Sequence, residues 1–78
     1  MQNQDINIKL TKEEAIVLFE FLVRINKNHS SEFIEDQSEQ RVLWNIESIL
    51  EKDLDDTFSD DYQEIIKLAR EKVRDKLE

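Results

Sequence analysis

The chain contains neither glycine nor proline among its 78 residues. These two residue types form most tight turns and interrupt regular elements, so a chain without them has few ways to build the hairpins of a β-sheet. Glutamate, lysine and leucine, which are all favourable in helices, are frequent instead. The sequence therefore predicts an all-α fold.

A chain of this length has room for one domain, residues 1–78. It has no cysteine, so it can form neither a disulfide framework nor a thiolate metal site, which fits a reducing compartment. No apolar run reaches the roughly 18 residues of a membrane span, and the first five residues lack the basic start of an export signal. We therefore expect a cytoplasmic protein without a membrane partner.

The first helix is predicted to begin at Thr11, because Thr11 and Glu14 have the spacing of a capping box. Residues 26–31 are polar and rich in asparagine and serine, so we expect them to end this helix and form the longest loop. The apolar residues between these limits cover about 260° of the helix surface. Such a helix must be covered on several sides, as the centre of a bundle or in an intermolecular contact.

Two further helices are predicted after residue 35. Asp36 and Glu39 provide a second cap, and the helix that follows is expected to end near Asp53. Its apolar face contains Val42, Leu43, Ile46, Ile49, Leu50 and Leu54. Ser59 is the predicted N-cap of the last helix. The apolar stripe of that helix contains Tyr62, Ile65, Ile66, Ala69, Val73 and Leu77. These helices together predict a small three-helix bundle with a short extended N-terminal segment.

The N-terminal segment 6–10 alternates apolar and polar residues, which is typical of a half-buried strand, but no second strand follows it. We consider two interpretations. In the first, the segment is an extended lead-in whose Ile8 and Leu10 pack into the bundle. In the second, it pairs with the same segment of another copy across a symmetry axis, so a homodimer is an open alternative.

No cofactor site or catalytic constellation is recognisable. The window Asp53–Glu64 has the oxygen-ligand spacing of an EF-hand, but Phe58 stands where the turn needs glycine, and Asp60 occupies a normally apolar position. His29 is the only histidine and has no second ligand beside it. Phosphate-binding loops require glycine. We therefore expect a protein that is not an enzyme and holds no metal or cofactor.

The charge of the chain is concentrated in its middle. Residues 35–64 contain eleven carboxylates and two basic residues, Arg41 and Lys52, which gives this stretch a formal charge of −9 in a chain of −8. Such a stretch repels phosphate and attracts a basic surface. The predicted partner is therefore a basic protein, and direct nucleic-acid binding is disfavoured.

Trp44 is the one large apolar residue outside the apolar face of the second helix, about 140° from its centre. Either Phe33, Ile34 or the N-terminal segment covers it, or it is an exposed anchor for a partner. If it is an anchor, the acidic residues of the same stretch form its rim. The predicted partner-binding residues are then Trp44, Glu47, Glu51, Asp55 and Asp56.

Three segments, Leu10–Ala15, Asp36–Trp44 and Ser59–Tyr62, resemble a group of short acidic helical bacterial proteins. In size, acidity and helical content the chain is also similar to nuclease-colicin immunity proteins and other toxin inhibitors. It lacks the Asp-x-x-Tyr-Tyr-Pro motif of the colicin group, since it has no proline and a single tyrosine. The resemblance implies an immunity or antitoxin-like protein that docks on a basic toxin such as a nuclease. The alternative is a self-associating structural homodimer.

Overall fold

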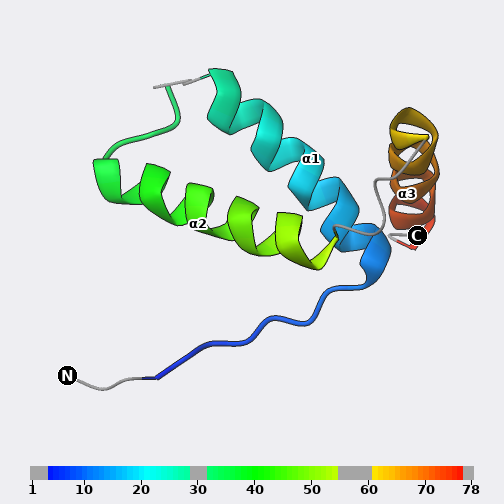
Figure 1. Ribbon diagram of the computed structural model, residues 1–78, viewed down its shortest axis with the longest axis horizontal. Coiled ribbons are helices and arrows are strands. Elements are labelled where there is room, and N and C mark those ends of the chain that lie inside the picture. Colours follow the sequence, from blue (N-terminus) through cyan, green and yellow to red (C-terminus); the bar gives the residue numbers. More distant parts are fainter. Residues whose placement is uncertain (1–3, 29–31, 55–60, 77–78) are drawn as a thin grey trace.

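The computed structural model describes residues 4–28, 32–54 and 61–76. They form three helices, α1 (Lys12–Asn28), α2 (Gln37–Asp53) and α3 (Tyr62–Lys76), and no strand occurs in these described ranges (Figure 1). The predicted all-α three-helix bundle is confirmed.

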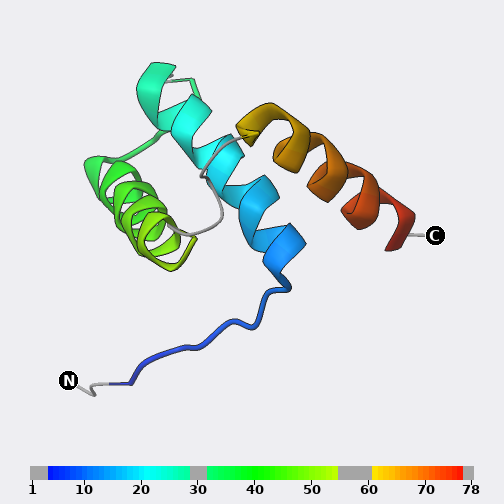
Figure 2. The same cartoon turned by 45° about the vertical axis from the view of Figure 1, so that its right-hand side comes forward.

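Helix α1 is the centre of the bundle. It packs against α2 on one side and α3 on another, while the described parts of α2 and α3 make no close backbone approach to each other. Figure 2 shows α1 between the other two helices. The buried core consists of Ile16, Phe19, Leu22, Leu50, Leu54, Ile66 and Ala69. The two helical neighbours thus cover most of the wide apolar surface of the first helix, but Phe21 stays exposed.

Two of the predicted helix caps are present. The backbone N–H of Thr11 donates to Glu14 Oε1 at 2.8 Å, and the N–H of Glu14 donates to Thr11 Oγ1 at 3.1 Å. At the start of α2, Asp36 Oδ2 accepts from the Ser38 N–H at 2.8 Å. Hydrogen bonds from the Ser38 hydroxyl and backbone lower the pKa of Asp36. The Glu39 carboxylate bonds to the N–H of Glu35, one residue before the cap.

The end of the first helix differs from the prediction. Helix α1 continues through Asn28, and Asn26, a residue of the predicted loop, is buried within the helix. The Asn26 amide donates to Glu47 Oε1 at 2.6 Å, and its Oδ1 accepts from Gln40 Nε2 at 2.8 Å. Because α2 satisfies both polar groups of this side chain, the helix does not need to end here. His29 lies outside the described residues.

The buried face of α2 is narrower than predicted. Val42 and Ile49 belong to the predicted apolar face, but 55% and 52% of their surfaces are exposed. Leu43 and Ile46 are half-buried against the core, and Leu50 is buried. Since α2 packs closely only on α1 among the described helices, it buries a narrow stripe instead of a broad face.

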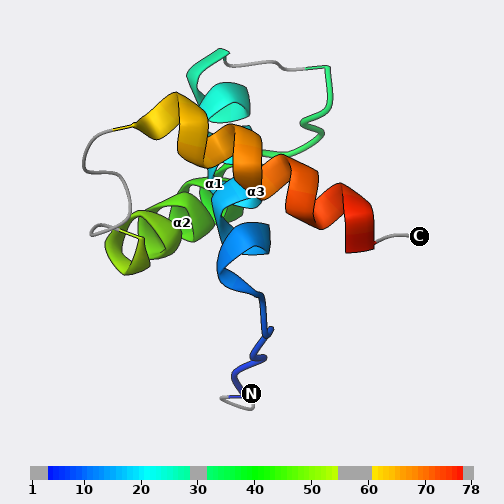
Figure 3. The same cartoon turned by 90° about the vertical axis from the view of Figure 1, so that its right-hand side faces the viewer.

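The N-terminal segment does not pack into the bundle. The exposed fraction is 86% for Ile6 and 79% for Ile8, and Leu10 is exposed as well. The segment projects beyond the helices as an extended chain in all three views (Figures 1–3). The interpretation of a lead-in that plugs the core is therefore wrong, and pairing with another copy stays a prediction.

Helix α3 begins at Tyr62, and the Asp61 carbonyl accepts from the N–H of Ile65 at 2.9 Å. Ser59, the predicted cap, lies outside the described residues, as does Leu77 of the predicted stripe. The other members of the stripe are buried or half-buried. The Tyr62 hydroxyl donates to Glu20 Oε1 at 2.6 Å, which ties the start of α3 to α1.

The tyrosine in this contact is expected to titrate late. Three effects raise the pKa of Tyr62 to about 12: burial, which is the largest, the hydrogen bond to Glu20, and the negative charge of the Glu20 carboxylate. The positive charge of Arg70 lowers this pKa by a smaller amount. Because Tyr62 is the only tyrosine, ultraviolet absorbance of the folded protein reports its ionisation directly. A midpoint near 10 in the native protein would contradict the contact.

The raised pKa also predicts a stability change in alkali. The Tyr62 contact contributes its full stabilisation of the fold below pH 10, the ordinary pKa of tyrosine. This stabilisation is lost as the pH rises to about 12, because the unfolded chain releases the tyrosine proton more readily than the folded protein does. Allowing for the partial exposure of Tyr62, we expect a loss on the order of 1 kcal/mol. Denaturant unfolding at several pH values measures it, and Tyr62→Phe, which cannot ionise, should show a smaller decline over the same interval.

Candidate protein-binding surface

Trp44 is exposed over 45% of its surface, so the interpretation in which neighbouring segments cover it is wrong. Phe33, one of the residues expected to cover it, is itself mostly exposed. The tryptophan borders a shallow depression between the C-terminal half of α1 and the middle of α2. The residues that line this depression are Val23, Asn26, Lys27, Trp44, Glu47 and Ser48.

Glu47 lies at the edge of this depression and is held in place. It is half-buried, and its Oε1 accepts the 2.6 Å hydrogen bond from Asn26. Asn26 is in turn fixed by Gln40, one turn before Trp44 on α2. A carboxylate has further acceptor positions, so Glu47 can still accept a donor from outside the protein. Its orientation is therefore set before any partner arrives.

Glu51 lies on the surface, one helical turn after Glu47. The spacings of three, four and seven residues place Trp44, Glu47 and Glu51 on one side of α2. The structure therefore brings three of the five predicted residues together. Asp55 and Asp56 lie outside the described residues, so their position relative to Trp44 stays a prediction.

We name the side chains of Trp44, Glu47 and Glu51, with the adjoining depression, the Trp44 surface. One basic residue, Lys27, also lines it and offsets part of its negative charge. The surface thus combines a half-exposed aromatic ring with two carboxylates, one fixed by a hydrogen bond and one exposed to solvent. This combination suits recognition of an arginine- or lysine-rich protein surface.

Sequence reasoning missed the part of Asn26 and Gln40 in this surface. Asn26 belongs to the predicted loop, and nothing in the local pattern links it to Glu47, which is 21 residues away. The one available signal was the seven-residue spacing of Gln40 and Glu47, which puts two polar residues on the same side of α2 beside the apolar stripe. The identity of their partner required the packing of α1 on α2.

Metal and membrane sites find no support in the described part of the chain. Among the residues that the structure describes, no group of three His, Cys, Asp or Glu side chains could hold a metal ion. The EF-hand-like window Asp53–Glu64 runs through residues 55–60, which lie outside the described residues. In those same described ranges, no helix has the length and apolar character needed to cross a membrane.

No protein-family model, curated protein or solved structure matches this chain. Its function must therefore be inferred from its own surface. At the Trp44 surface, exposure, charge and a prearranged hydrogen bond occur together.

Proposed function

We propose that this chain is a non-catalytic, acidic protein-binding module of the cytoplasm. It acts as an immunity- or antitoxin-like inhibitor and docks α2 on a basic protein, such as a nuclease toxin. The observation that carries the proposal is the half-exposed Trp44 beside Glu47 and Glu51, on a chain with a formal charge of −8.

Trp44 is the anchor of the proposed contact. Tryptophan is enriched among the few interface residues that supply most binding energy, because one rigid side chain buries a large apolar area. Burial of Trp44 in a partner would therefore contribute to affinity without requiring a change in the bundle.

The carboxylates around the anchor set direction and speed of association. Acidic residues attract a basic protein over distances of about 10 Å at moderate salt, and this steering raises association rates by about 10 to 10³. Glu47 adds specificity, because the Asn26 hydrogen bond fixes its carboxylate and reduces the entropy lost on binding. Glu51, Asp55 and Asp56 contribute at the rim, where single charges affect rate more than affinity.

The mode of inhibition follows from the chemistry of the target. A nuclease must gather phosphates, so its cleft carries lysine and arginine side chains. An acidic helix lying in that cleft neutralises those side chains, and its own charge repels the nucleic-acid backbone. The inhibitor therefore needs no catalytic group, only a negative surface with an apolar anchor.

A charge-neutralisation experiment tests this proposal. The variant Glu51→Gln/Asp55→Asn/Asp56→Asn should associate with the basic partner about tenfold more slowly at low ionic strength, because steering is weakened. The partner is first captured with the wild-type chain and identified. Association rates with the purified partner are then measured by surface plasmon resonance over a range of salt concentrations.

The matched control neutralises three exposed acids outside residues 35–64, in Glu32→Gln/Glu71→Gln/Asp75→Asn. It changes the net charge by the same amount but leaves α2 intact, so its association rate should fall much less. Equal effects of the two variants would show that only the total charge matters. An acidic partner, or one whose rate does not depend on salt, would contradict the proposal.

A further inference from the structure

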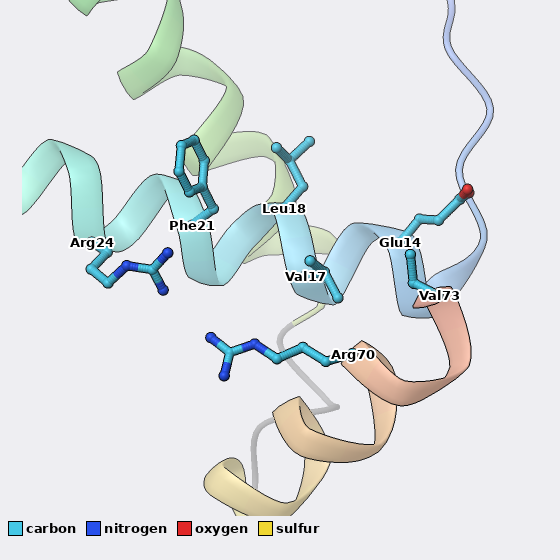
Figure 4. A pocket seen from close by; sticks show the side chains of 7 residues that line it. All are labelled: Glu14, Val17, Leu18, Phe21, Arg24, Arg70 and Val73. Carbon is cyan, nitrogen blue, oxygen red and sulfur yellow. The ribbon is translucent and has the colours of Figure 1, made fainter. Parts of the chain in front are cut away.

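A second groove lies between α1 and α3, away from α2. It has a volume of about 340 Å³ and an apolar floor, and its lining residues are Glu14, Val17, Leu18, Phe21, Arg24, Arg70 and Val73. Figure 4 shows the guanidinium groups of Arg24 and Arg70 extending toward the same space from the two helices. Glu14 and Val73 lie toward the other end of the groove. We name it the α1–α3 groove.

The two arginines are available at the rim of this groove. The Arg24 guanidinium lies 5.7 Å from the ring centre of Phe21, and its contact with Glu20 is a loose one of 3.7 Å. Both Arg24 and Arg70 are exposed. In a chain with an excess of eight negative charges, a pair of guanidinium groups above an apolar floor selects a segment with an apolar face and a carboxylate.

The N-terminal segment Asp5–Leu10 has this composition. Ile6 and Ile8 point to the same side of an extended chain and are almost fully exposed. Asp5 lies on the opposite side, so when the isoleucines face the groove floor its carboxylate is at the level of the rim, where the arginines lie. The segment cannot readily turn back onto the groove of its own chain, because the capping box fixes Thr11 and directs the preceding residues away from α1. A second copy of the chain does not face this constraint.

The lengths of the two elements agree. From Glu14 to Arg24 the groove follows about ten helical residues, or about 15 Å. From Leu10 to Asp5 the extended segment spans about 16 Å. A two-fold axis near the start of α1 places Leu10 of the second copy near Glu14 of the first. Asp5 of the second copy then reaches Arg24 and Arg70 of the first. This direction also keeps Lys9 at the Glu14 end of the groove, away from the guanidinium groups.

We propose that the chain forms an arm-exchanged homodimer. The N-terminal segment of each copy lies in the α1–α3 groove of the other, with Ile6 and Ile8 on the apolar floor and Asp5 between Arg24 and Arg70. The arrangement buries Ile6 and Ile8, two of the most exposed apolar side chains among the described residues. It leaves the Trp44 surface on α2 free, so it does not depend on the proposed function.

Charge-exchanged variants test the pairing. Asp5→Arg and Arg70→Glu each turn an attraction into a repulsion at both symmetric contacts, so each variant alone should dimerise about tenfold more weakly than the wild type. In an equimolar mixture of the two variants, the substituted side chains face each other at one contact, and the native Asp5 and Arg70 face each other at the second. Both contacts then pair opposite charges. Arg24 still repels the arginine introduced at position 5, so sedimentation of this mixture should show a heterodimer that is tighter than either variant alone and weaker than the wild-type homodimer.

A second pair of variants tests the apolar contact. Ile6→Asp/Ile8→Asp should be a monomer at concentrations where the wild type is a dimer. The control Ile49→Asp introduces the same side chain at an exposed apolar position on α2, outside the groove, and should leave dimerisation unchanged. Every substituted side chain is exposed, so we expect all variants to retain the three helices. Circular dichroism of each variant checks this.

Each outcome decides the proposal. Wild-type chain that stays monomeric from micromolar to submillimolar concentration would overturn it. The proposal would also be overturned if Ile6→Asp/Ile8→Asp is a monomer while Arg70→Glu dimerises like the wild type. That result would indicate that the two N-terminal segments pair with each other. A mixture no more associated than its components would disprove the assigned direction. Restored association in the mixture, with Ile49→Asp unchanged, would establish the exchange.

Discussion

Replacement of Leu22 by alanine is expected to lower the free energy of unfolding by about 3 kcal/mol. Leu22 is exposed over only 2% of its surface and belongs to the core face of α1, which packs against both other helices. A leucine-to-alanine change there removes apolar burial and leaves a cavity that two neighbouring helices must adjust to fill. Domains of this size have a total stability of about 4 to 12 kcal/mol, so the loss is a large fraction.

Urea unfolding followed by circular dichroism measures this effect. The fluorescence of Trp44, the only tryptophan, provides a second signal from α2. The matched control is Leu68→Ala, at an exposed position on α3, which should change the free energy of unfolding by less than about 0.5 kcal/mol. Equal midpoints for the two variants would show that α1 is not the central helix of the folded protein.

Replacement of Trp44 by alanine is expected to weaken partner binding by about 2 to 4 kcal/mol, or roughly 30- to 1,000-fold. The proposed interface has one large aromatic anchor, and loss of its buried area cannot be recovered by the carboxylates at the rim. The fold should be retained, because Trp44 is half exposed and does not belong to the core. Calorimetric titration of the purified partner measures the affinity.

Two further variants define the contribution of the indole ring. Trp44→Phe keeps an aromatic ring and should lie between wild type and alanine, whereas Phe33→Ala removes an exposed aromatic residue outside the Trp44 surface and should bind normally. In the wild-type complex, tryptophan fluorescence should shift to shorter wavelength as the ring leaves water. An unchanged affinity of Trp44→Ala would remove the anchor from the proposal.

The sequence predicted the secondary structure because its signals are local. The Thr11–Glu14 capping box and the Asp36 cap depend on residues two or three positions apart, and both were found at the expected helix starts. The end of α2 at Asp53 was also predicted. The position of Asn26 was wrong, because an isolated asparagine favours a loop, and only its contacts with α2 reverse that preference.

The candidate surface was predicted in part. Helical spacing placed Trp44, Glu47 and Glu51 on one side of α2, but it could not decide whether the tryptophan was covered. Whether Trp44 is covered depends on the path of the neighbouring segments, which helical spacing does not define. The sequence assigned Val42 and Ile49 to the apolar face of the helix, yet both are exposed, because an apolar pattern shows which residues share a face and not how many neighbours cover it.

By itself, the sequence determined that this chain is helical, where two of its helices begin, and that its negative charge is concentrated between residues 35 and 64. These properties follow from backbone propensity, short-range hydrogen bonds and formal charge. Only the tertiary structure decided that α1 is shared by two helices whose backbones stay apart, that Asn26 fixes Glu47, and that Ile6 and Ile8 are left in water. Exposure and long-range hydrogen bonds depend on which surfaces meet, and residues far apart in the chain carry no local signal of that meeting.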